Sequence, residues 1–152
     1  MNRYTVAVLV RNEFGVLNRV TSMFRRRQFN ISALTASETE SGEYSRITFS
    51  FDGEEENKQQ LINQLYKLPD VCSIKELTRD NSVSCELMMI KMKNDARDRA
   101  DIHAAAEAFG AETIDYSRDS FVLRLIGDSA KMDDFIMLMS DFTILEICRT
   151  GT

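Results

Sequence analysis

The stretch Arg11-Asn12-Glu13-Phe14-Gly15-Val16-Leu17 decides the fold, because it separates a strand pattern from a helix pattern. The apolar, β-branched run before it, residues 4–10, predicts a central strand that is buried on both faces. After it, apolar side chains recur every three or four residues, which predicts a helix with one stripe against a sheet. Asn12 to Gly15 is therefore predicted to be a tight turn, with Gly15 at the helix N-terminus.

This turn has the chemistry of an anion site. A helix start leaves backbone N–H groups unpaired at the positive end of the helix dipole, where a carboxylate or phosphate can bind. Gly15 permits close approach to the backbone, and Asn12 offers both a donor and an acceptor. An ordinary strand–helix turn also favours Asn and Gly, so the residues of the turn leave both interpretations open.

The rest of the first half completes a βαββαβ order. Strands are predicted over 31–38, 44–51 and 71–77, with a hairpin loop at 39–43 and a helix ended by Pro69. The apolar stripe of that helix is formed by Leu61, Ile62, Leu65 and Tyr66. Two helices on one face of a four-stranded antiparallel sheet make the ferredoxin-like arrangement, an α+β fold.

The pattern then repeats. Residues 78–83 are polar and predict a linker between a first domain, 1–77, and a second domain, 84–152. Strands of the second domain are predicted over 86–92, 112–116, 120–127 and 143–148, with two helices between them. The expected fold is two ferredoxin-like βαββαβ domains. Each domain is small for a self-sufficient core, which favours either packing of the two halves together or dimerisation.

Composition excludes several functions. The 152 residues are 43% hydrophobic and 28% charged, as in a globular protein, and the net charge of −5 disfavours nucleic-acid binding. The N-terminus has no signal pattern, and no apolar run is long enough to span a bilayer. Cys72, Cys85 and Cys148 form no CxxC pair, which is typical of reduced thiols in the cytosol. We expect a cytoplasmic protein without membrane or nucleic-acid partners.

No catalytic constellation stands out. His103 is the only histidine and lies in a predicted helix beside alanines, where a satisfied or surface histidine is expected, and a histidine-based metal site would need a second subunit. No P-loop or GxGxxG motif occurs. We expect no catalytic residues and no metal site. Phe49 and Phe51 could stack RNA bases in a recognition motif of the same strand order, but burial beneath the helices is preferred. The methionines of the second half are expected to fill its core: Met88, Met89, Met92, Met132, Met137 and Met139.

Residues 10–20 (Val-Arg-Asn-Glu-Phe-Gly-Val-Leu-Asn-Arg-Val) and 24–35 (Phe-Arg-Arg-Arg-Gln-Phe-Asn-Ile-Ser-Ala-Leu-Thr) resemble a known family. They look like the ACT domain of the acetolactate synthase (acetohydroxyacid synthase) regulatory small subunit. Residues 45–46, 65–77 and 147–151 also fit that family, so the resemblance runs the length of the chain.

The resemblance implies a non-catalytic regulatory subunit. Such a chain binds a separate catalytic large subunit, raises its activity and confers feedback inhibition by a branched-chain amino acid, with valine expected. Thiamine diphosphate, magnesium and FAD are expected only on the catalytic subunit, and no cofactor is expected in this chain. The alternative is a stand-alone ACT-domain amino-acid sensor that regulates a different enzyme.

The resemblance also implies where the effector binds. ACT domains pair in a homodimer, with amino-acid sites at their interface. The matching positions are Asn12, Gly15, Val16 and Leu17 from one chain, and Asn30 and Ile31 from the other. The effector carboxylate would bind the N–H groups of the helix start, and its ammonium would bind asparagine or backbone carbonyls. Its branched side chain would lie against Leu17 and Ile31.

Three features depart from the family pattern. Gln28 stands where the family usually has a helix-stopping glycine, just after the arginines of residues 25–27 that suit the end of a helix. Cys85 stands where the family often has arginine, and family members commonly continue beyond the position of Thr152. The last two departures bear on how the second half contacts its partner.

Overall fold

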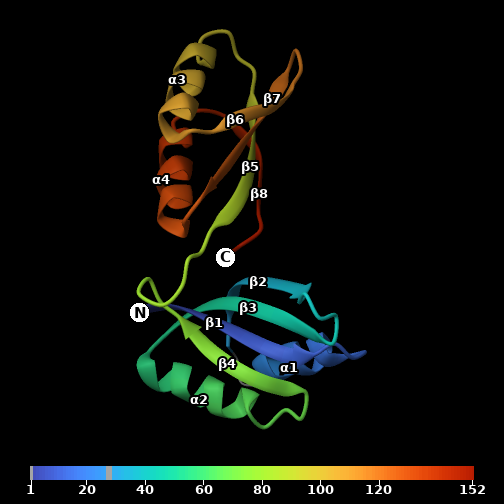
Figure 1. Ribbon diagram of the computed structural model, residues 1–152. Helices are drawn as coiled ribbons and strands as arrows, with labels where there is room; N and C mark the ends of the chain where they lie inside the picture. Colours follow the sequence, from blue (N-terminus) through green and yellow to red (C-terminus); the bar gives the residue numbers. More distant parts are fainter. Residues whose placement is uncertain (1, 27–28) are drawn as a thin grey trace. The chain divides into compact units, whose positions relative to one another are not determined.

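The computed structural model describes residues 2–26 and 29–152, and the chain divides into two compact units. The first unit ends at Val83 and also includes Gly151 and Thr152, whose carbonyl accepts a hydrogen bond from Thr35 Oγ1 at 2.8 Å. The second unit is Ser84–Thr150. Each unit has the βαββαβ order with two helices on one face of its sheet (Figure 1), so the predicted pair of ferredoxin-like folds is confirmed.

The first unit is an antiparallel sheet in the order β2-β3-β1-β4. Its elements are β1 (Asn2–Arg11), α1 (Val16–Arg26), β2 (Ile31–Glu38), β3 (Tyr44–Gly53), α2 (Glu55–Leu65) and β4 (Val71–Leu77). The long central strand β1 pairs with β3 from Asn2 opposite Gly53 to Arg11 opposite Tyr44. Strands β2 and β4 are therefore the edges of this sheet.

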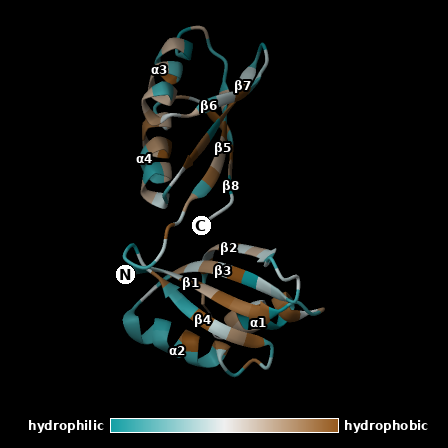
Figure 2. Cartoon of the chain, viewed as in Figure 1, coloured by the Kyte–Doolittle hydropathy of each residue, from teal (hydrophilic) through white to brown (hydrophobic). Residues whose placement is uncertain are grey.

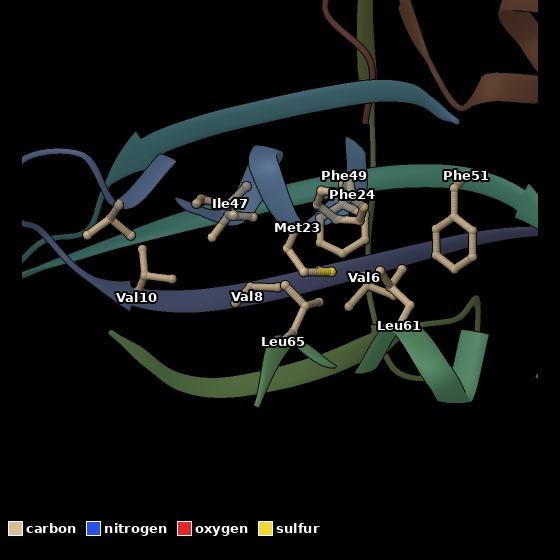
Figure 3. Packing of buried hydrophobic residues seen from close by; sticks show 12 residues of the cluster. Val6, Val8, Val10, Met23, Phe24, Ile47, Phe49, Phe51, Leu61 and Leu65 are labelled. Atoms are coloured by element: carbon tan, nitrogen blue, oxygen red, sulfur yellow. The ribbon is translucent and has the colours of Figure 1, made fainter. Parts of the chain in front are cut away.

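The core of the first unit lies between the sheet and its helices. Val6, Val8 and Val10 point from β1 toward α1 and α2 and are buried. Figure 3 shows them beside Met23 and Phe24 of α1, Leu61 and Leu65 of α2, and Ile47, Phe49 and Phe51 of β3. The alternate β1 residues, such as Ala7 and Leu9, remain partly exposed. The prediction that β1 is buried on both faces is wrong, because both helices cover the same face.

Phe49 and Phe51 are fully buried, and the Phe24 ring meets Phe49 edge-on with centroids 4.7 Å apart. The preferred prediction for these two residues is confirmed, because aromatic rings beneath the helices cannot stack on bases. Leu61 and Leu65 of α2 are buried in this core, whereas the rest of the helix is mostly hydrophilic in Figure 2; Lys58 is the exception among its charged residues, because it is buried and pairs with Glu55 and Glu76. Tyr66, predicted within the α2 stripe, follows the helix and is exposed.

The second unit repeats this plan in the order β6-β7-β5-β8. Its elements are β5 (Glu86–Lys93), α3 (Arg99–Phe109), β6 (Glu112–Tyr116), β7 (Ser120–Gly127), α4 (Ser129–Met139) and β8 (Ile144–Arg149). Gly110 stops α3 in the left-handed conformation, with φ of 69°. The buried methionines are Met88, Met92, Met132 and Met139. Met89 and Met137 are exposed, so their prediction as core residues is wrong. Met89 lies on the helix-free face of the sheet.

The end of the second unit is held by charges. Glu86 is buried, and Arg149 Nη2 donates to its carboxylate at 2.7 Å while Nη1 donates to Asp133 at 2.6 Å. Thr150 N–H donates to the Leu87 carbonyl at 3.0 Å. A buried carboxylate needs such a partner to offset its lost hydration. Arg149 therefore fastens β8 to β5 and α4.

Arg27 and Gln28 lie outside the described residues, so the departure from the family pattern at Gln28 stays a sequence observation. In residues 2–26 and 29–152, no helix combines the length and the apolar character needed to cross a membrane.

The candidate ligand-binding turn

The turn after β1 is tied to the sheet on two sides. The N–H of Arg11 donates to the Asp70 carbonyl at 2.9 Å, and the N–H of Asn12 donates to the Glu43 carbonyl at 2.8 Å. These bonds fasten the end of β1 to the start of β4 and to the β2–β3 hairpin. The chain then reverses through Gly15, whose φ of 80° is easily adopted only by a residue without a side chain.

The Asn12 side chain is anchored to the hairpin. Its amide nitrogen donates to Glu38 Oε1 at 3.1 Å and to the Gly42 carbonyl at 3.0 Å. Its oxygen accepts a hydrogen bond from Ser45 Oγ at 3.0 Å. Both amide protons are therefore used within the protein, while the oxygen keeps one lone pair. Asn12 shapes the turn and can still accept one bond from a ligand.

The start of α1 is open. The N–H of Arg19 donates to the Gly15 carbonyl at 2.9 Å, and the N–H of Val16 donates to the Glu13 carbonyl at 3.3 Å. Within residues 2–26 and 29–152, no backbone carbonyl accepts a hydrogen bond from the N–H of Leu17 or of Asn18. Val16 is buried in the core, whereas the Leu17 side chain is 43% exposed. The turn thus presents unpaired N–H groups beside an exposed apolar side chain.

Asn30 and Ile31 lie at the other end of the sheet. Ile31 opens β2 opposite Phe51, and Phe51 is opposite Tyr4 on β1. The turn follows Arg11, seven residues beyond Tyr4, which corresponds to roughly 23 Å along a strand. Asn30 is exposed and Ile31 is partly buried. Within one chain, the predicted site residues of the turn therefore lie far from Asn30 and Ile31.

The second unit contains a related turn that sequence analysis missed. After β5, Asn94 N–H donates to the Asp119 carbonyl at 2.9 Å, and Asn94 Nδ2 donates to the Ser117 carbonyl at 2.8 Å. These bonds reproduce those of Asn12 with its own hairpin. The available sequence signal was an asparagine directly after the first strand of each half.

The second turn carries its own carboxylate. Asp95 Oδ1 accepts the backbone N–H of Arg97 at 3.0 Å, and Asp95 Oδ2 accepts Arg97 Nη2 at 3.0 Å. The hydrogen bonds from the Arg97 side chain and backbone lower the pKa of Asp95 to about 2. This turn has no glycine, and the paired Asp95 and Arg97 side chains occupy it. It therefore lacks the open character of the first turn.

Other candidate chemistry is sparse in the described residues. His103 is partly buried and stacks on Phe121, with centroids 4.9 Å apart. No group of three or more His, Cys, Asp or Glu side chains in residues 2–26 and 29–152 is placed to hold a metal ion. The three cysteines are free and exposed.

Comparison with known proteins identifies both halves. Residues 6–73 match the small-subunit-like ACT domain of acetohydroxyacid synthase, and residues 85–152 match the family described as the small subunit of acetolactate synthase. A probable acetolactate synthase small subunit from Archaeoglobus fulgidus is 41% identical, over 98% of this chain and 93% of the relative. The acetolactate synthase small subunit of Bacillus subtilis is 40% identical, over 97% and 86%.

A solved structure agrees with this result. The acetolactate synthase small subunit from Thermotoga maritima superposes with a TM-score of 0.88 at 33% identity, covering 99% of this chain and 94% of the other. The fold and the glycine turn together define an ACT-domain protein. The chain belongs to the family of acetolactate synthase small subunits.

Proposed function

We propose that this chain is the regulatory subunit of an acetolactate synthase. It binds a separate catalytic large subunit, raises the activity of that subunit and transmits feedback inhibition by a branched-chain amino acid, valine being expected. Thiamine diphosphate, magnesium and FAD would be held by the large subunit alone. The observation that carries this proposal is the division of the predicted effector site between the two ends of one sheet.

A divided site needs a second copy of the chain. Strand β2 is an edge of the first sheet, and an edge strand can pair with the same strand of another copy. Antiparallel pairing about a two-fold axis at the middle of β2 would set Ile31 of one copy opposite Glu38 of the other. Glu38 is bonded to Asn12. This pairing therefore brings the Asn30 end of one copy to the glycine turn of its partner.

Such a composite site suits a zwitterion with a branched side chain. The open N–H groups at the start of α1 would donate hydrogen bonds to the carboxylate. The free lone pair of Asn12 and the Asn30 carbonyl oxygen would accept the ammonium. Leu17 from one copy and Ile31 from the other would cover the apolar side chain. Because the ligand touches both copies, its binding would bias the geometry of their interface.

The assembly can be tested by light scattering. We expect a homodimer of the 17.4 kDa chain, with β2 at the interface. A monomer at high protein concentration, both with and without valine, would contradict the composite site. Replacing Thr35 in the middle of β2 with proline removes its backbone N–H, together with the hydroxyl that donates to Thr152, and should weaken the dimer. The same change in β6, Ile114→Pro, is the matched control.

The activity is tested by capture and reconstitution. Tagged chain should recover the acetolactate synthase large subunit from a native lysate. The purified chain should show no turnover alone and should raise acetolactate formation when added to the large subunit. Recovery of a different enzyme, with amino-acid binding intact, would instead support a stand-alone ACT sensor.

A further inference from the structure

The Arg19 side chain lies beside the glycine turn, and its guanidinium points toward the turn. It lies one helical turn after Gly15, and a side chain four residues along a helix leans back over the earlier residue. Arg19 Nη1 lies 3.6 Å from the position that a Cβ atom on Gly15 would take. The guanidinium is therefore next to the open end of α1, where the proposed effector carboxylate would bind.

The orientation of this guanidinium is set by Asp70. Arg19 Nε donates to Asp70 Oδ2 at 2.7 Å, and the Asp70 side chain is only 12% exposed. Asp70 is itself fixed, because its carbonyl accepts the N–H of Arg11 at the end of β1. A carboxylate held at the junction of β1 and β4 thus restrains the arginine of α1.

The pairing with Asp70 uses only one of the five N–H donors of Arg19. Within residues 2–26 and 29–152, neither Nη1 nor Nη2 has a protein acceptor. A guanidinium held at Nε and free at both terminal nitrogens can form paired hydrogen bonds with a second carboxylate. The side chain is 43% exposed, so a ligand can reach it.

We propose that Arg19 binds the carboxylate of the effector, and that Asp70 is the residue that positions Arg19. This inference rests on the effector site proposed above and adds the group that recognises the acid. A helix N-terminus supplies only about half a unit of positive charge, whereas Arg19 supplies a full one. The pair therefore makes the site selective for an amino acid over its amide.

The second unit offers a matched arginine. Arg99 at the start of α3 donates its Nε to Asn94 Oδ1 at 2.7 Å, beside the turn that lacks glycine. Arg99→Gln makes the same change of charge next to a related turn. It serves as the control for Arg19→Gln.

The test is calorimetric titration of the full-length chain with valine and with valinamide, which has an amide in place of the carboxylate. In Arg19→Gln, valine affinity should fall about tenfold or more, as expected for a lost charge-assisted hydrogen bond. Valinamide affinity should change less than about threefold. Arg19→Lys keeps the charge without the paired geometry, so its affinity for valine should lie between those of the unmodified chain and Arg19→Gln. Asp70→Asn should also reduce the preference for valine, and Arg99→Gln should leave it unchanged.

Each outcome decides the matter. Retained valinamide binding by Arg19→Gln shows that the variant is folded, so a selective loss of valine supports the inference. A parallel loss of both ligands overturns it and makes Arg19 a structural residue. Unchanged valine affinity in Arg19→Gln also overturns it, while leaving the proposed effector site standing. Absence of valine binding by the unmodified chain overturns the effector site and this inference together.

Discussion

The two strand–helix turns of this chain share a plan and differ in what they leave open. In each, an asparagine directly after the first strand bonds to the facing hairpin through its backbone N–H and its side-chain nitrogen. Gly15 then leaves its own position in the first turn without a side chain, while the paired Asp95 and Arg97 side chains occupy the second turn. The fold thus supplies the same turn twice, and a few residues decide how open each turn is.

The largest effect is expected from Gly15→Asp. The added carboxylate would lie beside the carboxylate of the effector, and two such charges about 4 Å apart repel by roughly 4 kcal/mol at an effective dielectric near 20. It could also bind the free nitrogens of Arg19, since Nη1 is 3.6 Å from the new Cβ. Even a quarter of the roughly 4 kcal/mol repulsion between the two carboxylates would weaken effector binding about fivefold. Feedback inhibition of the reconstituted enzyme should be lost while activation is retained.

Two variants separate charge from backbone strain. Gly15→Ala carries the unfavourable positive φ without the charge and should retain more of its sensitivity to valine. Ala96→Asp adds a carboxylate to the second turn and should leave inhibition unchanged. Wild-type inhibition of the Gly15→Asp enzyme would place the effector elsewhere. Loss of activation together with inhibition would mean that the first turn also shapes the partner surface.

A smaller effect is expected from Asn30→Ala. If the side chain of Asn30 completes the site of the partner copy, its removal leaves a ligand group unpaired and weakens binding by about 1–3 kcal/mol. Titration with valine measures this loss, and a melting curve reports the stability of the fold. Unchanged affinity with a lowered melting temperature would indicate that Asn30 only supports the end of α1.

Asn12→Ala and Asn94→Ala compare the two anchors directly. Each change removes side-chain hydrogen bonds to a hairpin, so each should lower the free energy of unfolding by about 0.5–1.5 kcal/mol. Only Asn12→Ala should also weaken valine binding, because the proposed effector site lies at the first turn alone. Denaturant unfolding and valine titration of both variants check this. Equal losses of affinity would show that the two turns act as one unit.

The smallest effect concerns the charge that fills the second turn. Hydrogen bonds from Arg97 lower the pKa of Asp95 to about 2 from 3.8. The ionised pair should therefore persist above pH 4 and be lost as the pH falls toward 2. An NMR titration of the Asp95 carboxyl should show a midpoint near 2, and Arg97→Gln should raise it toward the ordinary value. A midpoint near 3.8 in the unmodified chain would contradict this pairing.

Much of the fold follows from local sequence. The strand and helix patterns predict the twelve elements of residues 2–26 and 29–152 in order, because side-chain periodicity is a local property. The exposure of Met89 was missed because the local sequence pattern of its strand does not show that one face of the second sheet is free of helices. The same reason explains the mistaken burial of β1 on both faces.

In the candidate site, too, the local features follow from the sequence and the long-range contacts follow from the tertiary structure. The sequence by itself determined the glycine turn and its asparagine, because both belong to one short stretch whose backbone requirements are local. Only the tertiary structure placed Asn30 at the opposite end of the sheet and brought Asp70 to Arg19, 51 residues away. Such contacts depend on strand order and register, which are set by burial of the whole sheet against its helices.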